Sequence, residues 1–482
     1  MAAVSSLGIG SGLDLNSLLA GLKTAEQIPL AALQKQQTSY TTKLTAYGQL
    51  SGALSGLQSA AAALAKPALF QGVKADSTVT DVLTATALST ASSGTYAVDV
   101  KQLSQAQSLA ANGVAPDAAF GAGGLVELKF EFGAVSTTTT PSTFTPDGTT
   151  RNGLVKISAG STMAAIAKAI NANTALGATA SIINNGDPAK PSQLVLTSKQ
   201  TGETSVMRIS VSGEAAGDTA LSGLLTYNPL DLTAQKPTQT AAAQNTKLTI
   251  NGIVITSPTN SVAGAIQDVT MSVSKIGTST VSVQKDTASV QGAISTFVAA
   301  YNSLQSVAAR LTAFDPSSKS GAVLLGDSTL RNIQVGIRSA LTTAQPDNVS
   351  GLKTLTQIGV SMQKDGTLAI DSAKLTAALG SNMNGVANLF SGSVSSYGAR
   401  MSSLIDGYTN ASGGVLTAAT KGINTTLDLL GKQYTATSER ADATVARYKA
   451  QFTQLDVMMS RMNQTSSYLT QQFDALNNTN NK

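Results

Sequence analysis

The chain has 482 residues, of which only 12% are charged, and its formal net charge is +5. It contains no cysteine, which excludes disulfides, thiol nucleophiles and thiolate metal sites. It also contains no histidine, which excludes a Ser-His-Asp triad and removes the commonest metal ligand and general base. We therefore expect neither a cofactor nor a catalytic site of these classes.

The basic residues are dispersed along the chain. No two Lys or Arg residues are adjacent, and aromatic residues make up only 4% of the sequence. Nucleic-acid binding requires a clustered cationic surface, and single-strand binding adds stacking aromatics, so we expect no nucleic-acid partner. The sequence also lacks an apolar run of 18 residues, so we expect no membrane insertion.

The N-terminal region begins with small residues and continues as a predicted helix. Residues 1–13 contain no cation and no long apolar segment, so we expect a flexible leader and no signal peptide. Leu15, Leu18, Leu19 and Leu22 then recur on one helix face, and Asp14 is among the available N-caps. The pair Ile28-Pro29 predicts an interruption, with a second helix that starts at Pro29 and ends before Pro67.

The C-terminal region shows a longer helical repeat, which predicts a coiled-coil seam. Apolar or small residues follow a spacing of four and three residues over about 54 Å of helix. They are Ala441, Val445, Tyr448, Phe452, Leu455, Met459, Met462, Ser466, Leu469, Phe473 and Leu476. Two interpretations remain open at this point. The seam either packs within one protomer, or it is partly open in the monomer and closes on assembly.

The middle of the chain changes to a period of two, which is typical of strands. Short strands are expected over 79–100, 125–132 and 269–283, and a strand, helix and strand over 153–184. A hairpin is predicted over 194–211 with its turn at 200–202, and a second one over 248–255 around Asn251-Gly252. Residues 137–140 and 231–245 are predicted to be loops, and the helical period returns from Thr287. The middle is therefore expected to be an insertion between two helical halves that meet.

Several segments resemble one known family. The stretch GIGSGLDLNSLLAGLKTAEQIPLAAL at 8–33 resembles the start of the FliD family of flagellar filament cap proteins, also called flagellar hook-associated protein 2. Three later segments are similar to its C-terminal half: FVAAYNSL at 297–304, LLGDSTLRNIQVGIRSAL at 324–341 and IGVSMQKDGTLAIDSAKLTAAL at 358–379. The segment 160–182, which contains Ile170-Asn171, resembles a repeat shared by flagellin and its relatives.

The resemblance implies a multidomain α+β fold. The terminal helices would form a coiled-coil or helical-bundle leg, and β-rich head domains would be inserted between them. The leg would pair residues 1–45 with 432–482, and a helical stem would pair 46–76 with 286–431, which also carries a short β-hairpin. The head would cover 77–285 and contain two subdomains, one nested at about 105–245.

The resemblance also implies a location and a set of partners. Such a protein would be secreted unfolded by the flagellar type III export apparatus with a cytoplasmic export chaperone. It would form a homo-oligomeric ring at the extracellular, distal filament tip, with a pentamer favoured over a tetramer or hexamer. There it would promote flagellin polymerisation and prevent leakage of flagellin monomers, and its partners would include flagellin and the hook–filament junction proteins. Adhesion to host mucus is a further expectation for a head exposed at the tip.

The candidate site is the apolar surface of the leg, which would contact the filament or a neighbouring protomer. Its residues are Leu15, Leu18, Leu19 and Leu22 in the N-terminal helix, with Leu455, Met459, Met462, Leu469, Phe473 and Leu476 in the C-terminal one. Two other classes of protein are alternatives to a cap. Another flagellar axial protein, such as a flagellin-like subunit or a junction protein, shares the composition and the terminal heptads. A hydrolase with paired carboxylates is disfavoured because the few acidic residues stand mostly in turn sequences, so we expect no enzyme.

Overall fold

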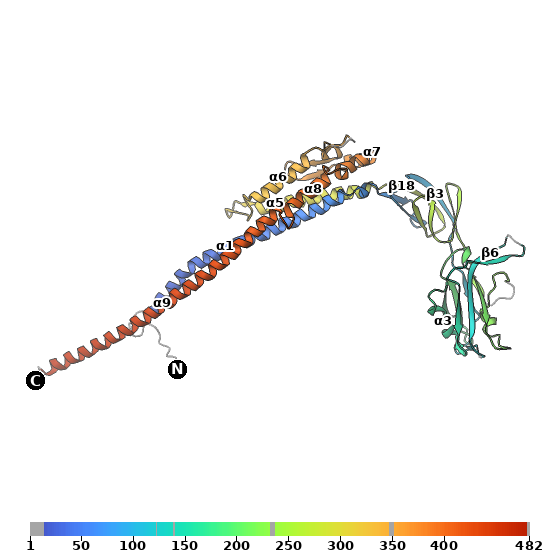
Figure 1. The fold of residues 1–482 in the computed structure, drawn as a ribbon, viewed down its shortest axis with the longest axis horizontal. Coiled ribbons are helices and arrows are strands. Elements are labelled where there is room, and N and C mark those ends of the chain that lie inside the picture. The colour runs from blue at the N-terminus through green and yellow to red at the C-terminus, as the bar shows by residue number, and fades with distance from the viewer. Residues whose placement is uncertain (1–13, 122, 138–139, 232–236, 347–350, 480–482) are drawn as a thin grey trace. The chain divides into compact units, whose positions relative to one another are not determined.

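The computed structural model describes residues 14–121, 123–137, 140–231, 237–346 and 351–479, without the side chains of 476–479. The chain divides into two units (Figure 1). The helical unit combines Met1–Phe70 with Thr287–Lys482, and the β unit is Gln71–Asp286. The β-rich middle is thus inserted between two helical segments that pack together, and the predicted α+β class is confirmed. The predicted leader at 1–13 lies outside the described residues.

The helical unit is dominated by two long helices at its ends. Its helices are α1 (Leu15–Leu64), α2 (Pro67–Phe70), α5 (Thr287–Thr312), α6 (Ser328–Thr342), a 3-10 turn (Leu355–Ile358), α7 (Ser372–Ser391), α8 (Tyr397–Thr409) and α9 (Val415–Thr479). Two small hairpins, β19–β20 (Phe314–Asp315, Ser320–Gly321) and β21–β22 (Val360–Met362, Leu368–Ile370), join them.

The helix α1 begins where the sequence predicts. The Asp14 side chain accepts a hydrogen bond of 2.9 Å from the Ser17 N–H and so caps the first turn. Threonine is a weak helix former, yet several α1 threonines, such as Thr38 and Thr42, donate their hydroxyls to the carbonyl four residues earlier. These bonds satisfy the hydroxyls on the helix itself, so a hydroxyl-rich segment can remain helical.

The predicted interruption at Ile28-Pro29 is wrong, because α1 runs through Pro29 as one helix of 50 residues. A proline inside a helix removes one backbone hydrogen bond and costs about 3 kcal/mol. Pro29 is exposed, while its neighbours Leu30 and Leu33 are half-buried in the seam that α1 forms with α9. Packing along this seam outweighs the local preference to end the helix.

The core of the helical unit surrounds the C-terminal half of α1. The side chains of Leu50, Leu54 and Leu57 are fully buried against residues of α5 and α8. Phe297 of α5 meets Phe390 of α7 edge to face, with ring centroids 6.5 Å apart. Each fully buried side chain of this size contributes about 1.5–3 kcal/mol to folding. This part of the unit is therefore a closed hydrophobic core.

The β unit contains several small antiparallel sheets. Its larger sheets have the orders β1-β18-β3-β14-β15, β10-β11-β4-β13, β12-β6-β7 with β8 also on β6, and β16-β17-β2, and β5 pairs with β9. The strands are β1 (Val73–Ser77), β2 (Leu83–Ala87), β3 (Gly94–Gln102), β4 (Ser108–Ala110), β5 (Ala119–Phe120), β6 (Val126–Ser136), β7 (Thr143–Pro146), β8 (Gly153–Ile157), β9 (Ser161–Thr162), β10 (Ala178–Asn184), β11 (Ser192–Ser198), β12 (Val206–Ser212), β13 (Thr238–Ala241), β14 (Thr246–Ile250), β15 (Ile253–Ser257), β16 (Ser261–Ile266), β17 (Val269–Val273) and β18 (Gly277–Lys285). Two helices, α3 (Met163–Ala172) and α4 (Ser222–Leu225), and a 3-10 turn (Glu203–Ser205) complete the unit.

Several predictions for the β unit are confirmed. The hairpin β14–β15 turns at Asn251-Gly252, which both adopt positive φ, 50° and 84°, as a two-residue turn of this kind requires. The predicted strand, helix and strand are β8, α3 and β10.

The predicted hairpin over 194–211 is wrong. Its two strands, β11 and β12, belong to different sheets, because β11 lies between β10 and β4 while β12 pairs with β6. The turn at Gly202 (φ 98°) carries the chain from one sheet to the other. The predicted loop over 231–245 also contains β13, which pairs with β4; residues 232–236 of this loop and 138–139 of the loop predicted over 137–140 lie outside the described part of the chain.

Candidate functional site: an uncovered apolar stripe on the C-terminal helix

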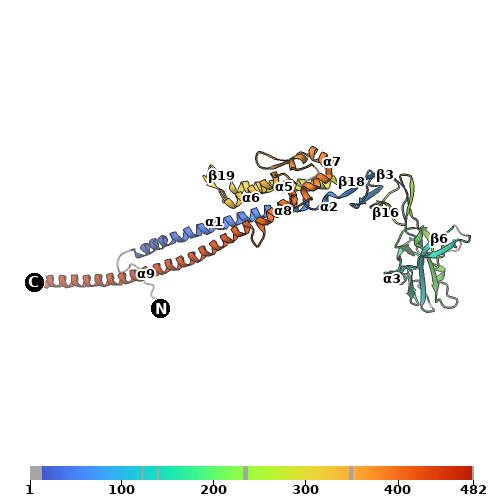
Figure 2. The ribbon, with the colours of Figure 1, turned by 45° about the horizontal axis from the view of Figure 1, so that its top comes forward.

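The helices α1 and α9 run antiparallel to each other (Figures 1 and 2). Near the other end of α1, the Gln58 side chain donates to the carbonyl of Ser402 in α8, the helix that precedes α9. Further along, a Cβ added at Gly431 in α9 would lie 4.0 Å from Gln37 Nε2. Because both helices rise equally per residue, Leu15 at the start of α1 lies opposite about residue 453. The rest of α9 therefore extends past α1.

The predicted seam residues of α9 are buried beside α1 and become exposed beyond the start of α1. Ala441 is 7% exposed, Val445, Tyr448 and Phe452 are half-buried, and Leu455 is 39% exposed. Farther along, Met462 is 60% exposed and Phe473 is 62% exposed. The spacing of the seam stays regular while its cover ends, so its last turns present apolar side chains to solvent in this chain alone.

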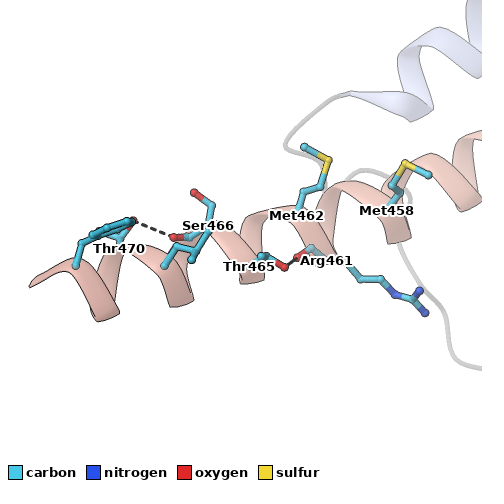
Figure 3. Close-up of a pocket in the computed structure, with 8 residues that line it drawn as sticks. Met458, Arg461, Met462, Thr465, Ser466 and Thr470 are labelled. Atoms are coloured by element: carbon cyan, nitrogen blue, oxygen red, sulfur yellow. Dashed lines mark hydrogen bonds between the residues drawn. The ribbon is translucent and has the colours of Figure 1, made fainter. Parts of the chain in front are cut away.

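The uncovered turns form one continuous surface, which we call the terminal stripe. It is a shallow groove of about 540 Å³ lined by Met458, Arg461, Met462, Thr465, Ser466, Leu469, Thr470 and Phe473. Figure 3 shows Met458 and Met462 on one side of the helix and Arg461 extending away from them. The hydroxyls of Thr465 and Thr470 donate to the Arg461 and Ser466 carbonyls at 2.9 Å (Figure 3). These two threonines thus satisfy their hydroxyls on α9 itself.

The terminal stripe carries little charge. Between Val457 and Phe473 the only charged residue is Arg461. Charges that flank a coiled-coil seam normally fix the partner and its orientation. With Arg461 as its single charged residue, the stripe offers little of this selection, and its surface is mainly apolar. Its methionines add flexible, polarisable side chains that accommodate imperfectly matched partners.

The four predicted residues of the N-terminal helix do not share one environment. Leu15 is buried, at 1% exposed, whereas Leu18 is 57% exposed. Leu19 and Leu22 are half-buried. The i, i+3, i+4, i+7 pattern predicted one continuous face, but Leu18 lies at its margin, away from the half-buried positions. Leu18 is thus the member of this set that is open to a partner.

The predicted residues of α9 separate into two groups. Met459 is half-buried and Leu455 lies near the point where α1 begins, whereas Met462, Leu469 and Phe473 belong to the terminal stripe. The side chain of Leu476 lies outside the described residues. That these residues contact a partner stays a prediction.

Sequence reasoning did not single out some residues of this surface. Thr465 and Thr470 line the stripe, and Tyr468, on another side of the helix, is 60% exposed. The two threonines flank the seam positions, so the heptad pattern itself could have indicated them.

A buried ionic cluster fixes α1 to the stem of the helical unit. Asp327, the N-cap of α6, accepts hydrogen bonds from the Leu330 N–H (3.0 Å), Lys43 Nζ (2.7 Å) and the Tyr47 hydroxyl (2.8 Å). Burial raises the pKa of Asp327, but the bonds from Lys43, Leu330 and Tyr47 outweigh it and hold that pKa below its usual value. The hydrogen bond that Lys43 donates to Asp327 also raises the pKa of Lys43. This cluster thus holds α1 against α6 at Lys43 and Tyr47, away from the terminal stripe.

Two further features of the described residues bear on other kinds of site. Among them, no group of three or more acidic residues is placed to hold a metal ion. No described helix combines the length and apolarity needed to cross a bilayer.

Three segments of the chain match profiles of known protein families. Residues 11–107 match the profile described as flagellar hook-associated protein 2 N-terminus, and residues 243–464 match its C-terminus profile. Residues 143–200 match the flagellin hook IN motif.

Similar full-length proteins extend this result. The chain is 38% identical to flagellar hook-associated protein 2 of Escherichia coli K12 over 100% of both sequences. It is 38% identical to the Salmonella typhimurium protein over 99% of this chain and 100% of that one. The crystal structure of the D1-D2-D3 domains of the flagellar cap protein FliD from Escherichia coli is similar, with a TM-score of 0.59 and 33% identity, covering 79% of this chain and 99% of that chain.

Proposed function

Because the chain belongs to the flagellar hook-associated protein 2 family, which includes the flagellar cap protein FliD of Escherichia coli, we propose that it assembles into a ring that caps the distal end of a growing flagellar filament. The observation that supports this most directly is the terminal stripe. An apolar surface at the end of a helix of 65 residues has no cover within the described chain and is suited to a partner outside it.

In this proposal the terminal helices act as legs. Residues 1–45 and 432–482 form the leg, 46–70 and 287–431 the stem, and the β unit, Gln71–Asp286, the head; the predicted stem boundary at residue 76 is moved because β1 pairs with β18. The stripe packs against subunits at the open filament end. Its neutral flanks and methionines suit a contact that is broken and remade as the filament lengthens, because many weak interactions release faster than a few strong ones.

The head in this proposal confines newly exported flagellin. The ring, with five copies favoured over four or six, promotes flagellin polymerisation and prevents leakage of the monomers. Export through the type III apparatus with a chaperone and assembly after the junction proteins belong to the same proposal. Adhesion to mucus has no support in the described surface and stays a prediction. The family is structural, which agrees with a role that needs no catalysis.

The variant Phe473→Asp tests the role of the terminal stripe. In cells that lack the native chain, we expect it to give short filaments and to release flagellin into the medium, because a carboxylate on the stripe opposes apolar docking. Val394→Asp is the matched control, since Val394 is 93% exposed but lies in the loop between α7 and α8. Filaments of normal length with Phe473→Asp would contradict the assignment of the stripe.

Immunogold labelling of flagellated cells separates the cap from its alternatives. Label confined to the distal filament tips supports the proposal. Label along the shaft would indicate a filament subunit, and label at the hook end would indicate a junction protein.

A further inference from the structure

Among the described residues of the β unit, the edge strand β15 is open for pairing. The strand β15 is the last strand of the sheet β1-β18-β3-β14-β15 and pairs only with β14. Because the Asn251-Gly252 turn makes Ile250 and Ile253 the closing pair, the N–H and C=O groups of Val254 and Thr256 point away from β14. Among the described residues, no hydrogen-bond partner faces these groups.

The side chains at this edge are apolar and exposed. Ile253 is 67% exposed and Val254 is 73% exposed. Ile253 lies opposite Ile250, whose side chain is buried in the core, so the apolar layer of the sheet continues to the edge and ends there without cover. The strand contains no charged residue and no proline. These are the features that normally make a strand edge adhesive.

The turn that leads into β15 is firmly held. Asn251 Oδ1 accepts a hydrogen bond of 2.8 Å from the Ala97 N–H of β3, and the Asn251 N–H donates to the Ala97 carbonyl at 2.9 Å. The edge is thus presented in a fixed conformation, which lowers the entropic cost of pairing with it.

Other sheet edges of the β unit are protected. On β10, the Asn171 side chain bonds both the N–H (2.9 Å) and the C=O (2.7 Å) of Ala180 and so occupies the edge. On β12, the backbone of Tyr227 does the same for Ile209, with bonds of 2.8 and 2.9 Å.

Most of the remaining edges use charge, proline, bulges or neighbours. The strand β1 carries Lys74 and Asp76 and lies beside β2, β7 ends at Pro146, and β8 carries Lys156. The strands β13 and β16 contain register shifts in their ladders. Natural sheets use such devices to prevent unwanted pairing. Their absence from β15 indicates that this edge is kept open for a partner.

We propose that β15 pairs with an extended segment of an unfolded polypeptide chain, which adds a strand to the sheet. This rests on the proposed function, because it names the way in which the head holds a newly exported chain. Backbone bonds to Val254 and Thr256 recognise any extended chain, and a branched aliphatic residue at every second position covers Ile253. The segment therefore alternates branched aliphatic residues, which face Ile253, with threonine, whose methyl group packs against Val254 on the other face, and it carries little charge.

A second copy of this chain fits the edge less well. Pairing of β15 with β15 is two-fold symmetric and closes after two copies, so it cannot extend into a ring. Most of the other edges that a second copy could offer are protected as described. A chain that has not yet folded has no such protection.

The test is binding of a fluorescent peptide to the full chain, measured by anisotropy. The peptide alternates valine and threonine over the length of β15, and its comparison peptide has N-methyl groups that remove half of the backbone donors. We expect the first to bind, and Val254→Lys to weaken it about tenfold or more, because the edge loses apolar contact and gains a charge. Leu88→Lys is the matched control, since Leu88 is 64% exposed in the same unit but outside β15.

A second variant acts on the backbone alone. Val254→Pro removes an N–H that points outward, which an edge strand tolerates, so the sheet stays folded while peptide binding falls. The proposal is overturned if the alternating peptide does not bind, if the N-methylated peptide binds equally, or if Val254→Lys and Leu88→Lys bind alike. Concentration-dependent dimers that Val254→Lys abolishes, without peptide binding, would assign the edge to a second copy instead. Each of these results leaves the outcome for Phe473→Asp in cells unchanged, so the two proposals fail separately.

Discussion

The same two helices build a closed core at one end of the helical unit and an open surface at the other. At the stem end, Leu54 of α1 is fully buried among α5 and α8. At the other end, α9 continues past α1, and Phe473 is 62% exposed. The seam residues repeat with comparable regularity in both places, so the repeat alone does not determine burial. The difference is set by where the partner helix begins.

This comparison separates stability from assembly. The stem end has its partners within the chain and is stable without help. The terminal stripe is uncovered among the described residues, so its residues contribute little to folding, and in the proposed function they act in docking. Substitutions at the stem end should therefore lower stability. Substitutions in the terminal stripe should leave stability almost unchanged and, in the proposed function, impair filament growth.

The largest effect on stability is expected at the stem end. Leu54→Ala should lower the free energy of unfolding of the helical unit by about 2–5 kcal/mol, because it leaves a cavity in a closed core. Phe473→Ala, the matched change at the open end, should alter it by about 0.5 kcal/mol or less. Urea unfolding followed by far-UV circular dichroism measures both. Equal losses for the two variants would mean that the terminal stripe is covered in the free chain.

A smaller effect is expected at the exposed proline of α1. Pro29→Ala should restore a backbone hydrogen bond and stabilise the helix locally by up to about 3 kcal/mol. Hydrogen exchange of the amides just before residue 29 should slow, while exchange around Leu54 stays unchanged. If exchange before residue 29 is unchanged, packing on α9, and not the missing hydrogen bond at Pro29, limits the local opening of the helix.

The smallest effect concerns the ionic cluster that joins α1 to α6. Asp327→Asn keeps an N-cap but removes the charge, so we expect a loss of about 1–2 kcal/mol near neutral pH. The pKa of Asp327 is lowered in the folded state, so its contribution is present above an unfolded pKa of about 4 and disappears as the pH falls through the folded value. The pKa of Lys43 is raised, so its contribution is present below an unfolded pKa of about 10.4 and disappears as the pH rises through the folded value.

Unfolding curves over a range of pH check this prediction. The difference between the wild type and Asp327→Asn should be greatest between those limits and should vanish in acid. Asp327→Ala, which also loses the cap, should keep part of its difference there, because the N–H of Leu330 stays unpaired. A difference for Asp327→Asn that persists in acid would assign the effect to packing.

Much of the fold could be predicted from local patterns. The helical ends, the inserted β-rich middle and the hairpin at Asn251-Gly252 follow from periodicity and turn chemistry, which act over a few residues. The continuation of α1 through Pro29 could not, because long-range packing on α9 outweighs a local rule. The separation of β11 from β12 could not either, since their turn resembles a hairpin turn and only sheet pairing distinguishes the two cases.

The candidate site was predictable in part for the same reason. The heptads identified Met462, Leu469 and Phe473, but not which positions α1 covers, because this depends on the three-dimensional register of two distant segments. Leu15 shows the limit most clearly, since it belongs to the predicted face and is nevertheless buried. The open edge of β15 also depends on which strands end each sheet.

The insertion of the β unit has a consequence for how such proteins change over time. Its first and last strands, β1 and β18, pair with each other, with Val73 opposite Lys285, and the Asp286 N–H donates to the Gly72 carbonyl. The chain thus enters and leaves the insert at neighbouring points. An insert with this geometry can be exchanged as a unit. Recombination could replace it with another insert without altering the spacing of the helices on either side. The β unit can then diversify while the helical unit and its seams are kept.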